Sequence, residues 1–322
     1  MVISIARYRS RLRTPMRFGG ETFQEREGFF VAMEGPAGIG IGEVAPLPGV
    51  HRESLDRCLA ALASSGGEPR LDHPPSLAFG LDIARAFAYG DPVLCRPLRP
   101  SVGVNELLAD GGRPSGSART VKVKVGRGPI ELERAMLAEI IAACPAARLR
   151  IDANRSLTLD EAKKLFEGLD PARVEYLEEP LSLPLELPAL HFATGLSIAL
   201  DESLHEPRLR AALETAPGVV AHVIKPSLIG GILAVRERAE RTARQGLRTT
   251  VTSTFESSYT LRVLARLITW LPATGGEHGL GTAGLLLDDP CIPPLVRDWS
   301  ISTEGPVPTP TLPFVQLERP GG

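Results

Sequence analysis

Residues 120–126 read Thr-Val-Lys-Val-Lys-Val-Gly, an apolar and largely β-branched run that carries two lysines. In an extended strand the three valines point to one side, and Lys122 and Lys124 point to the other. Burial and a neighbouring positive charge both disfavour a lysine ammonium, so both lower its pKa. The pattern indicates either an edge strand with a solvated lysine face or a lysine tuned to act as a base near neutral pH.

Further apolar runs downstream favour the second interpretation, because most of them end in an ionisable residue. Four runs lie at 148–152, 174–178, 197–201 and 221–225, and their ends, counted from Lys124, follow at steps of 23–28 residues. Another run, at 249–252, continues the period. A regular step of one strand and one helix, with chemistry at the carboxyl ends of the strands, is typical of a (β/α) barrel with its site on that face.

The composition is that of an ordinary soluble globular protein, with 322 residues, 43% hydrophobic and 23% charged. The formal net charge of −2 gives no sign of a nucleic-acid or anionic-membrane partner. The N-terminal apolar stretch is too short for a signal peptide, and no run of about 18 apolar residues predicts a membrane span. We therefore expect a cytoplasmic protein.

The chain divides into three predicted parts: an α+β capping domain at 1–97, a (β/α) barrel at 98–290 and a tail at 291–322 that packs back on the capping domain. The turn residues at 35–38 predict a hairpin, and the polar residues 16–28 predict a mobile loop between strands. The barrel strands are expected near 101–105, 120–125, 148–152, 174–178, 197–201, 221–225, 248–252 and 279–282.

Three carboxylates, Asp152, Glu178 and Asp201, end three successive predicted strands and so converge at the barrel mouth. Acids so placed repel one another unless a cation lies between them. Oxygen ligands without Cys or His favour a hard ion, Mg²⁺ first and Mn²⁺ second. Asn154 is placed to hydrogen-bond a ligating carboxylate. The alternative is a set of unrelated surface acids that cap helices.

Two further assignments concern side chains close to the proposed metal ligands. Only one of the adjacent Glu178 and Glu179 can point inward, and we choose Glu178 because Glu179 begins a loop with Pro180. Arg150 shares the inward face of its strand with Asp152. It either binds a substrate carboxylate or forms a buried structural ion pair, and we count it among the substrate-binding candidates.

Lys225 ends the sixth predicted strand, across the barrel from Lys122 and Lys124. Lysines from facing strands, with a metal between them, would flank a small-molecule substrate bound through its carboxylate. That layout suits removal of a proton α to the carboxylate. One lysine is the base, while the metal and another ammonium stabilise the enediolate.

Together these motifs resemble the enolase superfamily, in its muconate-lactonizing subgroup, over nearly the whole chain. More narrowly, two loops at 42–49 and 252–258 are similar to those of the o-succinylbenzoate synthase family. The motifs that carry the resemblance are Lys122-x-Lys124, Asp152-Ala-Asn, Glu178-Glu-Pro, Asp201-Glu-Ser and Lys225-Pro-Ser-Leu.

The resemblance implies a fold, a reaction and a role for each residue. The fold is the superfamily's barrel with its capping domain, and the reaction is a Mg²⁺-dependent syn dehydration of 2-succinyl-6-hydroxy-2,4-cyclohexadiene-1-carboxylate to 2-succinylbenzoate in menaquinone biosynthesis. Loops at 16–28 and 46–51 would close over the site, and a monomer is expected. The implied roles are base and then acid for Lys124, pKa tuning for Lys122, charge stabilisation for Lys225, metal binding for Asp152, Glu178 and Asp201, and substrate binding for Thr252, Ser253 and the backbone at Gly279.

Three alternatives remain at this point. An N-acylamino acid racemase needs one base on each side of the α-carbon, and Lys124 and Lys225 would serve. A muconate-type cycloisomerase and a metal-binding homologue without catalysis are weaker alternatives. The region 279–282 has no Asp-x-Asp pair, which dipeptide epimerases of the superfamily use, so this activity is disfavoured.

Overall fold

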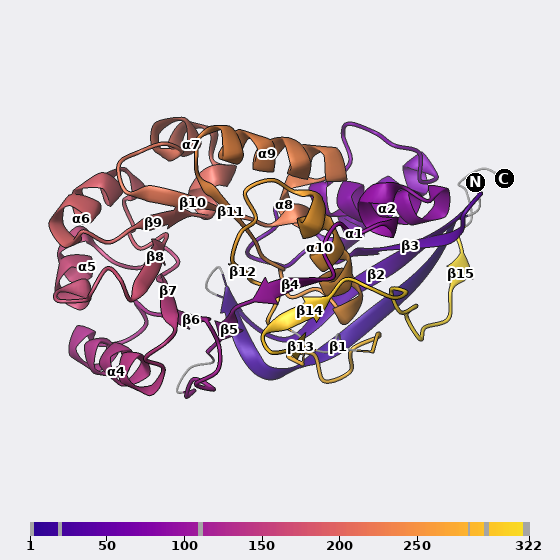
Figure 1. Cartoon of the computed structure of the whole chain (residues 1–322). Helices are drawn as coiled ribbons and strands as arrows, with labels where there is room; N and C mark the ends of the chain where they lie inside the picture. Colours follow the sequence, from indigo (N-terminus) through magenta and orange to yellow (C-terminus); the bar gives the residue numbers. More distant parts are fainter. Residues whose placement is uncertain (1–2, 19–20, 109–111, 283, 293–295, 318–322) are drawn as a thin grey trace.

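The computed structural model describes residues 3–18, 21–108, 112–282, 284–292 and 296–317. Figure 1 shows a ring of strands and outer helices on one side and a long antiparallel sheet with its own helices on the other. The predicted combination of a (β/α) barrel and an α+β N-terminal part is confirmed. None of the described helices is long and apolar enough to cross a membrane.

The N-terminal sheet contains β1 (Ile3–Phe18), β2 (Glu21–Gly35) and β3 (Gly38–Val44), all antiparallel. The predicted mobile loop at 16–28 is wrong. Residues 16–18 pair with residues 21–23, and the ladder continues to Ile3 and Met33 after one register shift. Residues 19–20 lie outside the described part. Much of the 22–28 segment is exposed, so its strand lacks the apolar alternation that would have revealed it.

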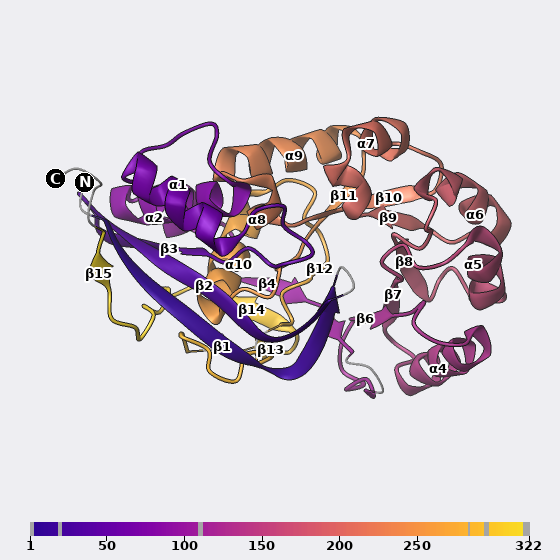
Figure 2. The same cartoon turned by 180° about the vertical axis from the view of Figure 1, so that it is seen from behind.

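Helices α1 (Leu55–Ser65) and α2 (Pro75–Tyr89) cover one face of this sheet (Figure 2). The approach of α2 to β3 is very close. A Cβ on Gly42 would lie 1.8 Å from the Gly80 carbonyl oxygen. There is therefore no room for a side chain at this position. This contact fixes the segment after β3, which borders the cavity described below.

The barrel sheet runs in the order β11-β10-β9-β8-β7-β6-β5, and every pair is parallel. It closes because β12 pairs with β4, and a bridge joins Thr252 to Gly279. The strands are β4 (Ser101–Val104), β5 (Glu106–Leu107), β6 (Thr120–Lys124), β7 (Arg148–Asp152), β8 (Val174–Glu178), β9 (Ile198–Leu200), β10 (Val219–Ile224), β11 (Arg248–Val251) and β12 (Glu277–His278).

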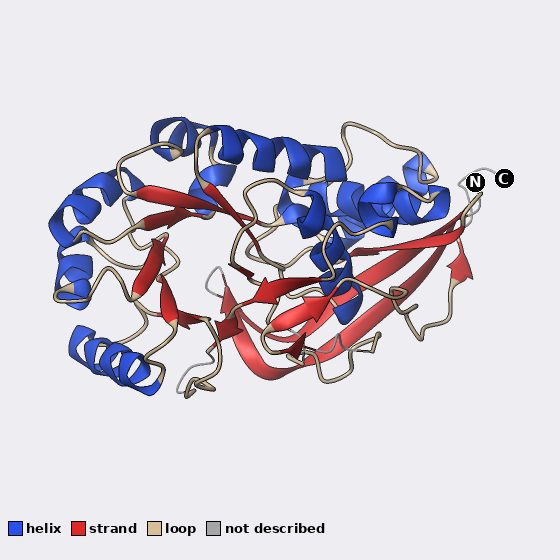
Figure 3. Cartoon of the chain, viewed as in Figure 1, coloured by secondary structure: helices blue, strands red, loops and turns tan. Residues whose placement is uncertain are grey.

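Helices surround the strand ring (Figure 3). One of them, α10, is buried over most of its length and belongs to a core cluster that also contains residues of the N-terminal sheet and α2. The helices are α3 (Pro92–Cys95), α4 (Ile130–Ala143), α5 (Leu159–Phe166), α6 (Leu187–Thr194), α7 (Pro207–Leu213), α8 (Pro226–Ile229), α9 (Ile232–Arg244) and α10 (Ser258–Trp270), with 3₁₀ turns η1 (Pro184–Glu186) and η2 (Glu202–His205).

The C-terminal segment contacts both parts of the molecule. Its strands β13 (Val296–Arg297) and β14 (Ser300–Ser302) extend a sheet that contains the barrel strand β4. Only the last strand, β15 (Val315–Gln316), pairs with β1. The tail therefore joins the barrel before it reaches the N-terminal sheet.

Candidate active site

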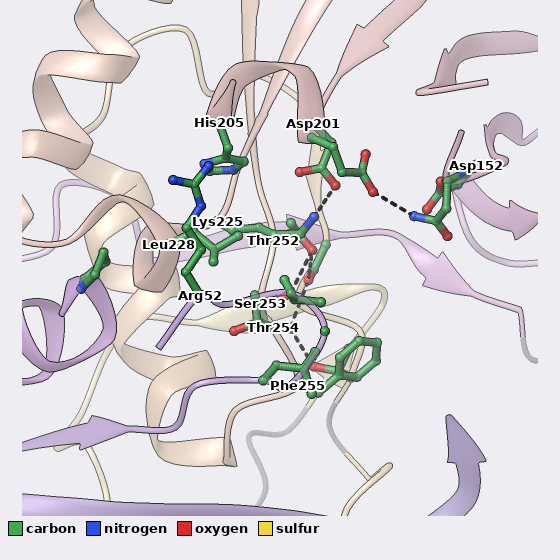
Figure 4. Close-up of a pocket in the computed structure, with 18 of the residues that line it drawn as sticks. Arg52, Asp152, Asp201, His205, Lys225, Leu228, Thr252, Ser253, Thr254 and Phe255 are labelled. Atoms are coloured by element: carbon green, nitrogen blue, oxygen red, sulfur yellow. Dashed lines mark hydrogen bonds and ion pairs between the residues drawn. The ribbon is translucent and has the colours of Figure 1, made fainter. Parts of the chain in front are cut away.

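A cavity of about 790 Å³ lies between the carboxyl ends of the barrel strands and the segment that follows β3. Figure 4 shows Asp152, Asp201 and Lys225 facing it from the barrel. Strand β6 presents Lys122 and Lys124 to the cavity, while Val121, Val123 and Val125 pack in the core beneath the outer helices. The alternation predicted for residues 120–126 therefore places the lysines inward.

Lys122 is held between two acids. Its Nζ lies 2.8 Å from Glu178 Oε1 and 2.9 Å from Asp152 Oδ2. Burial disfavours the ammonium, but Asp152 and Glu178 more than offset it and raise the pKa of Lys122. Conversely, although burial favours its neutral form, Lys122 and Lys124 hold the pKa of Asp152 at about 2. Lys122 is therefore a fixed cation.

Lys124, two residues further along the strand, has a different environment. Its Nζ donates a hydrogen bond of 2.8 Å to Asn154 Oδ1 and lies 4.0 Å from Asp152 Oδ2. Burial lowers the pKa of Lys124, Asp152 partly opposes this, and the positive charges of Lys122 and Arg127 lower it further. Environments that push two pKa values apart assign a charged role to one group and a base role to the other.

Across the barrel, Lys225 forms an ion pair with Asp201 Oδ2. Burial disfavours the ammonium, but Asp201 and its acidic neighbours raise the pKa of Lys225. The second oxygen of Asp201, Oδ1, is buried and has no hydrogen-bond partner within the described residues. Burial above all raises the pKa of Asp201.

The three predicted metal ligands lie at the carboxyl ends of adjacent strands. Asp152 is directly opposite Glu178 in the β7–β8 ladder, and Asp201 directly follows β9. Among the described residues, no three His, Cys, Asp or Glu side chains are grouped closely enough to hold a metal ion. Lysine ammonium groups instead provide the counter-charges, Lys122 for two of the acids and Lys225 for Asp201. The donor set still fits a hard cation in its chemistry, since it is oxygen-only and includes the unpartnered Asp201 Oδ1.

Comparison with known proteins identifies the family. Residues 2–88 match the family described as "MenC, N-terminal domain", and residues 104–285 match "Enolase C-terminal domain-like". The o-succinylbenzoate synthase of Klebsiella pneumoniae (strain 342) is 34% identical over 307 residues, which cover 91% of this chain and 90% of that protein. The chain belongs to the o-succinylbenzoate synthase family. As a member of it, the chain is a metal-dependent enzyme, a carbon–oxygen lyase (dehydratase).

Solved structures agree with this placement. The o-succinylbenzoate synthase from Thermosynechococcus elongatus BP-1, complexed with Mg in its active site, is 25% identical, with a TM-score of 0.69 over 87% of this chain and 93% of that one. The N-succinyl Arg/Lys racemase from Bacillus cereus ATCC 14579 has a TM-score of 0.80 over 98% of this chain and 95% of that one at 16% identity. The similarity to the racemase shows a shared fold.

Glu178 and Glu179 of this o-succinylbenzoate synthase family member point in different directions. Glu178 contacts Lys122, as chosen from the sequence, whereas Glu179 accepts hydrogen bonds from the backbone nitrogens of Asp201 (2.9 Å) and Ser203 (2.7 Å). Arg155 also pairs with Glu179, at 3.0 Å. Glu179 therefore fixes the backbone that presents Asp201.

Arg150 requires a correction. It is 1% exposed, does not line the cavity, and donates to both carboxylate oxygens of Glu175 at 2.9 and 3.1 Å. It also donates to the Glu277 carbonyl at 2.8 Å. The assignment of Arg150 to substrate binding is therefore wrong. The alternative, a buried structural ion pair, is the one found in the structure. Although Arg150 faces inward, it lies too deep in the barrel to reach the cavity.

The predicted substrate-binding groups all line the cavity, but their donors are engaged within the protein. Thr252 Oγ1 donates to the Gly279 carbonyl at 3.1 Å, and the Gly279 amide donates to Val251 at 2.8 Å. Ser253 Oγ lies 2.9 Å from Thr282 Oγ1. These groups therefore form part of the cavity wall, and the donors named here are already used within the protein rather than open to a substrate carboxylate.

Two buried charged residues that sequence reasoning missed join the N-terminal part to the barrel. Arg26 on β2 donates to the backbone carbonyls of Pro46 (3.0 Å), Thr254 (3.3 Å) and Phe255 (3.2 Å), and also to that of Ala45. Glu43 accepts hydrogen bonds at the start of α10. Arg26 lay in the predicted loop, and no local pattern marks its partners, because they are far away in the sequence.

Proposed function

We propose that this enzyme catalyses the syn dehydration of 2-succinyl-6-hydroxy-2,4-cyclohexadiene-1-carboxylate to 2-succinylbenzoate in menaquinone biosynthesis. The observation that carries the proposal is the contrast between Lys122 and Lys124. One is a fixed ammonium between two carboxylates, while the other has a lowered pKa and faces the cavity. A base beside a fixed positive charge suits removal of a proton α to a carboxylate.

In the proposed reaction, neutral Lys124 removes the proton on the ring carbon that bears the carboxylate. The electron pair of that C–H bond passes first to the carboxylate, giving an enediolate, and then returns to form the new ring double bond as the C–O bond at the neighbouring carbon breaks. The Lys124 ammonium then gives its proton to the departing hydroxyl, which leaves as water. Atoms and electrons balance without an oxidant, and one group serves both steps because loss of proton and hydroxyl occurs on the same face.

Lys225 stabilises the negative charge that develops on the substrate carboxylate, from the opposite side of the cavity. We propose that Asp152, Glu178 and Asp201 hold the divalent ion, Mg²⁺ before Mn²⁺, with Asn154 supporting them. When bound, that ion would supply Lewis-acid stabilisation of the same carboxylate. Thr252, Ser253 and Gly279 are proposed to contact the substrate as cavity wall. We also propose a cytoplasmic monomer.

The test is an ultraviolet assay with Mg²⁺ that follows loss of the diene chromophore, with N-succinylamino acids examined in parallel by polarimetry. Fast dehydration, abolished by a chelator and restored by Mg²⁺, is expected. Racemisation in the absence of dehydration would contradict the proposal and move the activity to the acylamino-acid racemases.

A further inference from the structure

The cavity needs a second cationic group if the substrate carries two carboxylates. The three lysines serve the reacting ring and its carboxylate. The groups expected to bind the other end of the substrate, at Thr252 and Gly279, already donate their hydrogen bonds to carbonyls of the protein. A carboxylate without donors is strongly disfavoured in a cavity. The partner for the second carboxylate must therefore lie elsewhere on the wall.

Arg52 is the candidate that the N-terminal part offers. Its neighbours in sequence are anchored. His51, which is 8% exposed, accepts a hydrogen bond of 2.9 Å from the Leu47 amide, and Glu53, also 8% exposed, accepts one of 2.9 Å from the Ser76 amide. Arg52 itself lines the cavity and makes no hydrogen bond or ion pair with any described residue. A fixed backbone thus presents an uncommitted guanidinium.

His205, at the end of η2, lies beside that guanidinium (Figure 4). Its Nε2 is buried and has no hydrogen-bond partner within the described part of the chain. Burial above all, and then the nearby positive charges of Lys225, Arg238 and Arg52, lower the pKa of His205 to about 4. Lys225 and Arg52 are cations that line the cavity and act on this imidazole, and they favour an anion at this end of the cavity.

We propose that Arg52 and His205 form the subsite for the distal carboxylate of the substrate, the one at the end of its succinyl chain. This inference rests on the proposed dehydration. Arg52 binds the carboxylate through its planar guanidinium, and His205, with its proton on Nε2, donates a further hydrogen bond. Leu228 lies next to them in Figure 4 and lines the cavity, where it covers the methylene groups of the chain.

The test compares two ligands that differ only at the distal group. 2-Succinylbenzoate has both carboxylates, and 2-butanoylbenzoate keeps the ring carboxylate and the ketone but ends in a methyl group. Calorimetric titration with saturating Mg²⁺ is carried out on the wild type, Arg52→Gln and the control Arg57→Gln, after circular dichroism confirms the fold. Arg57 is an exposed arginine of α1 at the rim of the same cavity.

We expect Arg52→Gln to weaken binding of 2-succinylbenzoate by about 10-fold or more and binding of 2-butanoylbenzoate by less than about 2-fold. The KM for the diene substrate should rise more than kcat falls, and His205→Asn should show the same selectivity to a smaller degree. Equal losses for both ligands, or the same selectivity in Arg57→Gln, would overturn the inference while leaving the dehydration intact. A wild type that neither binds 2-succinylbenzoate nor dehydrates the diene would overturn both.

Discussion

Glu43 and Ser257, which are 214 positions apart in the sequence, are joined by two hydrogen bonds, from the Ser257 amide at 3.0 Å and from its hydroxyl at 2.5 Å. The same carboxylate also accepts from Thr260 at 2.7 Å and from the Tyr8 hydroxyl. An acid of the N-terminal sheet therefore satisfies the first turn of α10, a helix whose preceding loop lines the active-site cavity.

We expect Glu43→Gln to lower the free energy of unfolding by about 1–3 kcal/mol, because an amide cannot accept from all these buried donors. Urea denaturation measures the change. Glu34→Gln, at an exposed position of β2, is the matched control and should be close to neutral. Equal stability of the two variants would contradict the role assigned to Glu43.

Arg26→Met should loosen the loops on both sides of the cavity, because Arg26 satisfies carbonyls at Ala45 and Pro46 and at Thr254 and Phe255. Hydrogen exchange should become faster in both segments at once, and kcat/KM should fall. Arg9→Met provides the control, since Arg9 lies on the neighbouring strand and forms exposed ion pairs with Glu25 and Glu27. If exchange speeds up in one segment alone, Arg26 does not link the two.

Gly279 permits the contact with Thr252 that shapes one wall of the cavity. A Cβ at Gly279 would lie 2.4 Å from Thr252 Oγ1 and 2.7 Å from its Cβ. Gly279→Ala should therefore displace Thr252 and reduce kcat/KM by about 10-fold or more. Gly275→Ala is the control, because nothing lies within 4 Å of its Cβ. Wild-type kinetics in Gly279→Ala would show that the position of Thr252 does not matter.

Acid should destabilise the protein partly through buried histidines. Burial above all lowers the pKa of His222 to about 4 and that of His278 to about 3, whereas a histidine in the unfolded chain has a pKa of about 6.5. Between these values the unfolded chain binds protons that the folded protein does not. The stability they contribute is complete above pH of about 6.5 and falls as the pH drops toward 4, by at most about 1.4 kcal/mol per pH unit for each ring.

Urea denaturation between pH 7.5 and 4.5 tests this, with His278→Asn as the variant. Asparagine keeps an acceptor for the Val251 amide, which donates to His278 Nδ1 at 3.1 Å, but it takes up no proton. The variant should lose less stability on acidification than the wild type. An unchanged pH dependence would exclude His278 as a source of acid sensitivity.

Much of the barrel was predictable because its signals are local. Most of the strands are apolar runs, most of these runs end in an ionisable residue, and the interval between them is nearly constant. Lys124, Asp152, Glu178 and Asp201 could therefore be placed at one end of the barrel from spacing alone. Strand alternation also gave the inward direction of Lys122 and Lys124.

The remaining features depend on depth and on distant partners, which spacing does not contain. Alternation places Arg150 inward but does not say that Glu175 holds it below the cavity. The strand segment at 22–28 is largely exposed and held by cross-strand pairs such as Arg9 and Glu27, at 2.5 Å, so it resembled a loop. Arg26 bonds to carbonyls 228 and 229 positions away, and carbonyl oxygens carry no sequence signature.

The central claim is that Lys124 is the base, and the most direct measurement is the dehydration rate of Lys124→Ala at saturating Mg²⁺. Because neighbouring Lys122 keeps its two acidic partners, the variant should fold and bind 2-succinylbenzoate, yet its kcat should fall by at least about 100-fold. Exchange of the substrate α-proton with deuterated solvent should also cease. A folded Lys124→Ala enzyme that dehydrates the diene within about 10-fold of the wild-type rate would contradict the account.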